Sequence, residues 1–179
     1  MDEALQVGRL KGHVFERSMN AGNFAALALA AGLVAFAAEA SQAADGPLAS
    51  FAGNWSGAGK ITVQNGSSER IRCRSSNTAS GNALGLTLRC ASDSYKFELA
   101  SDITSDGGNL SGSWNETTRG VVGSLSGKAT ASHITATANA VGFNAELLIR
   151  SSGNSLSVSI RSPGSEISEV AISMARGGR

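Results

Sequence analysis

The stretch LGLTLRCASDSYKFELASDI, residues 84–103, alternates apolar and polar side chains in two successive runs. The apolar side of the two runs consists of Leu84, Leu86, Leu88, Cys90, Tyr95, Phe97, Leu99 and Ile103. Alternation with period two is typical of strands that bury one face. Residues 143–150, 156–161 and 169–176 repeat the pattern, and nothing after Pro47 reads as a long amphipathic helix. The sequence therefore predicts an all-β domain over residues 53–177.

Short turn signals separate these runs. They are Gln64-Asn65-Gly66, Ser80-Gly81-Asn82, Asp106-Gly107-Gly108, Ser152-Gly153-Asn154 and Ser162-Pro163-Gly164. Strands with one buried face and tight links favour an antiparallel meander over a parallel sheet. We expect eight to ten strands that close into an up-and-down barrel, because closure removes exposed edges. A two-sheet β-sandwich is the alternative.

The two cysteines give an independent check on this register. If Cys73 and Cys90 face each other across a hairpin, the turn between them centres on Gly81 and Asn82, where the turn signal already lies. The same register places Arg74 opposite Arg89, and Arg70 opposite Asp93. We predict a disulfide between the cysteines; metal ligation is the rival, but no cluster of His or Cys accompanies them.

The chain begins with features of an export signal. Residues 24–38, FAALALAAGLVAFAA, form an uncharged apolar run of 15 residues, shorter than the roughly 20 of a membrane-spanning helix. Basic residues precede the run, and small residues before Ala44 suit cleavage after Ala43. We predict a leader with a signal-peptide helix at 1–43, a short linker at 44–52, and a periplasmic or secreted location with no span after cleavage. A buried Ala-rich helix is the alternative.

The remaining residues argue against catalysis. His133 is the only histidine after the leader, and no Gly-x-Ser-x-Gly elbow, metal-ligand spacing or phosphate-binding loop occurs. Residues 44–179 carry 12 Lys and Arg against 10 Asp and Glu, a net charge near +2. A net charge this small gives no electrostatic reason to expect nucleic-acid binding. We therefore expect neither an enzyme nor a cofactor or metal site.

One group of charges is clustered. Residues 70, 72 and 74 are arginines on one side of a predicted strand, and the hairpin register adds a fourth on the next strand: Arg70, Arg72, Arg74 and Arg89. Such a patch could dock an anionic lipid, a polysaccharide or an acidic protein. The alternative is an ordinary solvated outer face, since Asp93 and Glu98 are predicted neighbours.

The inward positions predict a ligand site. Both tryptophans stand in Gly-x-Trp, and the aromatic residues we expect inside the barrel as ligand contacts are Trp55, Trp114, Tyr95 and Phe97. Glycine and alanine occupy many other inward positions, notably in 121–129 and 133–140. The large side chains therefore either fill the interior or leave a cavity for a small apolar ligand.

The Gly53-x-Trp55 sequence followed by a β-meander resembles lipocalins and the related avidins. In lipocalins that Trp plugs one end of the barrel, commonly beneath an Arg from the last strand, and Arg176 would be the equivalent here. The biotin-contacting pattern of avidins is not recognisable. A second resemblance is to small periplasmic inhibitors of bacterial metalloproteases, barrels with one disulfide. It would imply a protease-binding segment at residues 44–50, with Pro47 and Leu48 as candidates.

The overall character of FAGNWSG, LRCASDSYKFEL and SGSWNET, residues 51–57, 88–99 and 111–117, resembles small secreted proteins of rhizobia and related alphaproteobacteria. That resemblance implies export and fold but no mechanism. Taken together, the sequence predicts a non-enzymatic exported barrel for a small apolar or amphipathic ligand. The alternatives are a periplasmic protease inhibitor or protein-binding module, and a structural envelope protein with a filled core.

Overall fold

The structure is a computed structural model, and it describes residues 46–177 of the chain. The predicted leader at 1–43, its cleavage site and the start of the linker lie outside the described residues. Export and location therefore stay predictions. Within residues 46–177, no helix has the length and the apolar character needed to cross a membrane.

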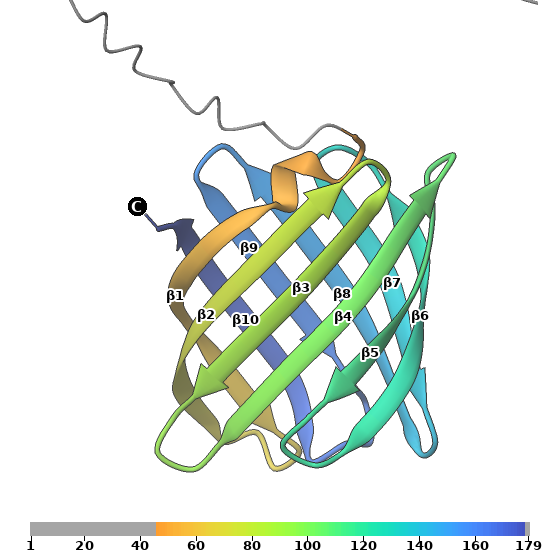
Figure 1. The fold of residues 1–179 in the computed structure, drawn as a ribbon. Helices are drawn as coiled ribbons and strands as arrows, with labels where there is room; N and C mark the ends of the chain where they lie inside the picture. Colours follow the sequence, from red (N-terminus) through yellow and green to blue (C-terminus); the bar gives the residue numbers. More distant parts are fainter. Residues whose placement is uncertain (1–45, 178–179) are drawn as a thin grey trace, which may run out of the picture. The chain divides into compact units, whose positions relative to one another are not determined.

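In the described part of the chain, ten antiparallel strands form a closed barrel (Figure 1). Each strand pairs with its neighbours in the sequence, and β1 pairs with β10 to close the sheet. The strands are β1 (Gly53–Val63), β2 (Ser68–Ser80), β3 (Ala83–Ala91), β4 (Lys96–Asp106), β5 (Asn109–Glu116), β6 (Val121–Ala129), β7 (His133–Ala140), β8 (Phe143–Ser152), β9 (Ser155–Arg161) and β10 (Ile167–Arg176). This confirms the predicted all-β up-and-down barrel and excludes the sandwich.

The turns between strands gather at two ends of the barrel. The end where the chain enters, which we call the closed end, carries turns 81–82, 107–108, 130–132 and 153–154. The opposite end, which we call the mouth end, carries turns 64–67, 92–95, 117–120, 141–142 and 162–166. All five predicted turn signals lie between strands. Of the other four turns, 117–120 and 141–142 contain one glycine each, Gly120 and Gly142, and 92–95 and 130–132 contain no Gly, Asn or Pro.

The β2–β3 hairpin has the predicted register. Cys73 faces Cys90 and the two form a disulfide with a sequence separation of 17, inside the barrel. A loop of this length contributes about 3 kcal/mol in the chain-entropy account. The predicted pairing of Arg70 with Asp93 is wrong, because the ladder ends at Arg72 and Ala91, and Asp93 lies in turn 92–95.

Inward and outward residues alternate along every strand, as the sequence pattern predicts. The inner face of β2 carries the buried residues Ile71, Cys73, Ser75 and Asn77. Glycine occupies wall positions where neighbouring strands approach closely. A Cβ on Gly57, for example, would collide with the Ser173 carbonyl oxygen of β10. The lack of a side chain at Gly57 therefore allows β1 and β10 to lie close together.

A plug made by the N-terminal segment fills the closed end. The short 3-10 helix η1 (Ala49–Phe51) follows Leu48, and both Leu48 and Phe51 are buried. Figure 1 shows η1 across this end of the barrel, at the start of β1. The predicted linker at 44–52 thus includes residues that belong to the core.

Candidate ligand-binding cavity

The plug is held by hydrogen bonds that converge on one carbonyl group. The Phe51 carbonyl oxygen accepts from Trp55 Nε1 at 3.0 Å and from Asn77 Nδ2 at 2.9 Å. The Arg176 guanidinium stacks 4.1 Å from the centroid of the Trp55 ring and donates to the carbonyl oxygens of Ala52 and Ser50. This is the Trp and Arg arrangement that the lipocalin resemblance implies. Trp55 therefore closes the barrel.

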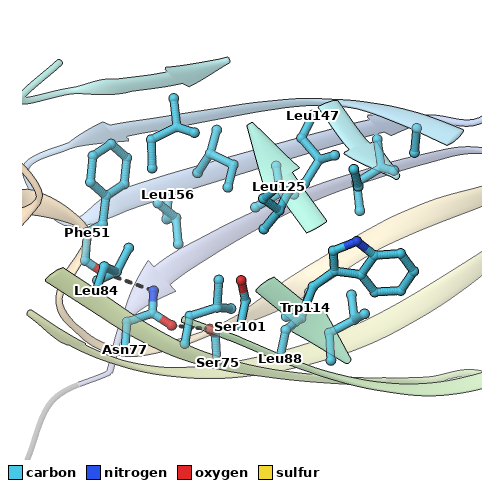
Figure 2. A pocket seen from close by; sticks show the side chains of 18 of the residues that line it. Phe51, Ser75, Asn77, Leu84, Leu88, Ser101, Trp114, Leu125, Leu147 and Leu156 are labelled. Atoms are coloured by element: carbon cyan, nitrogen blue, oxygen red, sulfur yellow. Dashed lines mark hydrogen bonds between the residues drawn. The ribbon is translucent and has the colours of Figure 1, made fainter. Parts of the chain in front are cut away.

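An apolar cavity of about 120 Å³ lies inside the barrel, and its lining extends from Phe51 in the plug to Trp114 and Phe143 near the mouth end. Figure 2 shows Phe51 and Trp114 at opposite ends of it. Its lining comes from every strand except β1, with β5, β6 and β10 contributing one residue each. The apolar residues that line it include Phe51, Leu84, Leu88, Trp114, Leu125, Ile134, Ala138, Phe143, Leu147, Leu156 and Met174. The interior is therefore not filled by side chains.

Three polar side chains reach this cavity, and each has a partner in the barrel wall. Ser75 Oγ lies 2.5 Å from Asn77 Oδ1 and 3.0 Å from the Thr87 carbonyl oxygen (Figure 2 shows the first of these bonds). Ser101 Oγ donates to the Ser113 carbonyl oxygen at 2.8 Å. Because these groups are already paired, the cavity offers an occupant a mainly apolar surface.

A second hollow, of about 310 Å³, lies at the mouth end. It shares four lining residues with the cavity: Leu99, Trp114, Phe143 and Ile160. Its rim is polar and includes Glu116, Arg119, Ser162, Ser165, Glu166 and Glu169. These four shared residues, which we call the passage, therefore lie between a polar rim and an apolar interior.

The rings of Trp114 and Phe143 face each other in this passage. Their centroids are 5.4 Å apart and their planes are tilted by 58°. The Trp114 indole rests on Gly123, where a Cβ would lie 2.6 Å from Nε1. Nε1 is buried and has no hydrogen-bond partner among the described residues. Among those residues, packing rather than a hydrogen bond holds the indole in place.

Glu116 organises the turn beside the mouth. Its Oε1 accepts from the backbone N–H groups of Glu98 and Thr118, both at 3.1 Å, and its Oε2 accepts from Arg119 N–H at 2.8 Å. The Arg119 guanidinium adds an ion pair at 3.7 Å. Burial alone would raise the pKa of Glu116, but the hydrogen bonds from residues 98, 118 and 119 outweigh it and hold the pKa below its ordinary value.

The predicted ligand contacts are distributed unevenly over this site. Trp114 lines both the cavity and the mouth, and Phe97 lines only the mouth. Trp55 lies in the plug, and Tyr95 packs on the core without lining either space. Phe143 in the passage was missed, although its place on the apolar side of the alternating run 143–150 was the available signal.

The predicted basic patch lies on the outside of the barrel, away from the cavity. Arg70, Arg72, Arg74 and Arg89 are all exposed, and Arg89 forms an ion pair with Glu98 at 2.7 Å. Within residues 46–177, no group of three or more His, Cys, Asp or Glu side chains is placed to hold a metal ion.

No protein-family model matches this sequence, and no curated protein is significantly similar to it. Among solved structures, the chain is similar to Rv2717c from M. tuberculosis, with a TM-score of 0.57 and 13% identity over 72% of this chain and 94% of that one. It is also similar to the S-type phycobiliprotein lyase CPES from Guillardia theta, with a TM-score of 0.48 and 9% identity over 73% and 90% of the two chains.

The likeness to Rv2717c supports a small β-barrel fold and nothing more specific. The resemblance to secreted proteins of rhizobia finds no support in sequence and stays a prediction.

Proposed function

We propose that this protein is an exported, non-enzymatic binding protein whose barrel holds a small apolar or amphipathic ligand. The observation that carries the proposal is the apolar cavity of about 120 Å³, joined by shared lining residues to a hollow at the mouth end. A well-packed domain leaves few voids larger than a water molecule. A cavity of this kind therefore offers space for a small apolar molecule.

The size and the lining of the cavity limit the ligand. Apolar cavities of about 150 Å³ stay dry and accept benzene-sized molecules. The interior here suits one ring or a short alkyl segment, and burial of that segment supplies roughly 25 cal/mol per Å² of apolar surface. A larger ligand would extend through the passage and place its polar part near Arg119, Ser162 and Ser165 at the rim.

The other predicted functions fit the described residues less well. Of the two candidates for insertion into a protease, Pro47 is exposed, whereas Leu48 is fully buried in the plug and would have to leave the core to reach a cleft. The filled-core alternative conflicts with the cavity. The Cys73–Cys90 disulfide supports the proposal of export, since such bonds persist in oxidising compartments.

The cavity can be tested by filling it. Ala138 is buried on the inner face of β7 and lines the cavity, whereas Thr135 is exposed on the outer face of the same strand. We expect Ala138→Leu to weaken the binding of 1-octanol, measured by isothermal titration calorimetry, by at least roughly tenfold, because the added side chain occupies the void. Thr135→Leu should leave binding within about twofold of the original protein.

Thermal unfolding of both variants serves as the folding control. Equal octanol binding by Ala138→Leu, Thr135→Leu and the original protein would show that the ligand binds elsewhere. Absence of binding by the original protein to octanol, toluene and octylamine would refute the proposed ligand class.

A further inference from the structure

The cations of the barrel are concentrated on one part of its outer surface. Five exposed cations, which we call the β1–β3 basic face, lie on the outward positions of three adjacent strands: Lys60, Arg70, Arg72, Arg74 and Arg89. The outward positions of β1, β2 and β3 carry no carboxylate. Residues 46–177 hold 11 Lys and Arg and 9 Asp and Glu, so the part outside this face has six cations against nine anions. The described molecule is therefore electrostatically polarised.

Like charges are direct neighbours on this face. Lys60 lies opposite Arg70 across β1 and β2, and Arg74 lies opposite Arg89 across β2 and β3. Like charges placed directly opposite each other destabilise a sheet. Only Arg89 has an ion-pair partner, and none of the described carboxylates lies within 4.0 Å of the other four cations. The stability of the fold therefore does not explain why these cations lie next to one another.

The face is also hollowed. A depression of about 900 Å³ lies over β1 to β4, where Arg72, Arg74, Arg89 and Lys96 meet the polar side chains of Asn54, Ser56, Ser76 and Thr87. One carboxylate also lines it, that of Glu98, which is paired with Arg89. A smaller depression of about 370 Å³ is lined by Lys60 and Arg70, together with Glu69. Three arginines, residues 70, 72 and 74, follow the strand at about 7 Å intervals, since each residue advances about 3.3 Å.

These features favour an extended chain of anions over other anionic partners. The guanidinium groups can bind carboxylates or sulfates through paired hydrogen bonds, and the hydroxyl groups can bind sugar oxygens. The outward positions of β1–β3 carry no aromatic residue on which the bases of a single-stranded nucleic acid could stack. The exposed large apolar residues of the described chain, Val122 and Val141, lie at β6 and turn 141–142, so this face has none to insert into a membrane.

We propose that the β1–β3 basic face binds an acidic polysaccharide, a linear chain that carries carboxylates or sulfates. The chain lies along β2, with its anionic groups on Arg70, Arg72 and Arg74 and its neutral part on the hydroxyl groups beside them. This surface lies on the outer side of the wall, so its binding does not depend on the ligand in the cavity.

The experiment compares two triple variants that remove the same charge. Arg70→Ser/Arg72→Ser/Arg74→Ser changes the face, and Lys128→Ser/Arg150→Ser/Arg161→Ser changes exposed outward cations on β6, β8 and β9. Binding to alginate, a polymer of uronic acids, is measured by calorimetry, with neutral dextran as the reference polymer. We expect the first variant to bind alginate about tenfold more weakly at low salt, and the second within about twofold.

The salt dependence gives a second readout. Alginate binding by the original protein should fall steeply between about 0.05 and 0.3 M NaCl, and that dependence should flatten in the Arg70, Arg72, Arg74 variant. Equal losses of alginate binding in both triple variants would show that only the net charge of the protein matters, and would overturn the proposal. Binding to vesicles of anionic phospholipid without binding to alginate would also overturn it, in favour of a membrane surface.

Discussion

Gly53 adopts a φ of 121°, and the guanidinium of Arg176 occupies the space that a Cβ on Gly53 would need. The glycine of the first Gly-x-Trp therefore serves the plug in two ways: it bends the chain into β1, and it leaves room for the arginine to reach Trp55. The second such glycine, Gly112, acts differently, because a Cβ there would collide with the Asp102 carbonyl oxygen on β4. The same sequence motif thus has two separate physical roles.

A substitution at Gly53 tests this account of the plug. Gly53→Ala should lower the free energy of unfolding by about 1–3 kcal/mol, since alanine is strained at this φ and its Cβ collides with Arg176. Urea unfolding measures the change. Gly85→Ala is the matched control, because the nearest atom to its Cβ is 3.6 Å away. If both variants unfold at the same urea concentration, the proposed role of Gly53 is wrong.

Turn 117–120 depends on the element that precedes it. The β5 strand ends at Glu116, whose carboxylate accepts hydrogen bonds from the backbone of the adjacent strand β4, at Glu98, and of the turn itself, at residues 118 and 119. Because the folded state holds the pKa of Glu116 below its ordinary value, the carboxylate stabilises the fold above that value. This contribution is lost as the pH falls through the folded-state pKa.

Glu116→Gln separates this contribution from packing. The variant keeps the size of the side chain but leaves at least one of the three part-buried backbone N–H groups without its acceptor, so we expect a loss of about 1–2 kcal/mol at neutral pH. As the pH falls below the ordinary pKa of a glutamate, about 4.3, the difference from the original protein should begin to shrink, and it should continue to shrink until the original carboxyl is protonated in the folded state too. Chemical unfolding at several pH values measures both effects.

Glu146→Gln, at an exposed outward position of β8, is the control for removal of one negative charge. A difference between Glu116→Gln and the original protein that stays constant down to pH 3 would contradict the role of the Glu116 carboxylate.

Across the whole molecule, alternation predicted the direction of side chains better than their depth. The inward placement of Trp114, Phe97 and the cysteines follows from period-two spacing and from the Gly81 turn. That spacing does not tell how far along the barrel axis a residue lies, because depth depends on the tilt and stagger of the strands. Trp55 was therefore expected beside a ligand but lies in the plug, and Phe143 in the passage was missed.

Two further parts of the molecule were beyond the sequence pattern. Leu48 and Phe51 precede the first strand and carry no periodic signal, yet they fill one end of the barrel. The sequence pattern also does not tell whether the inward residues fill the core or leave a cavity. That outcome depends on how small and large side chains meet across the barrel. Ala138 is one of the small side chains that leave the space open.

The central claim is that the cavity holds a ligand, and native mass spectrometry of the protein tests it most directly. The protein would be produced in a bacterial periplasm and purified without denaturation, next to the Ala138→Leu variant. We predict a folded species with the added mass of one small molecule, retained by the original protein and absent from the variant. A bare polypeptide mass for both, unchanged after incubation with octanol, would contradict the claim.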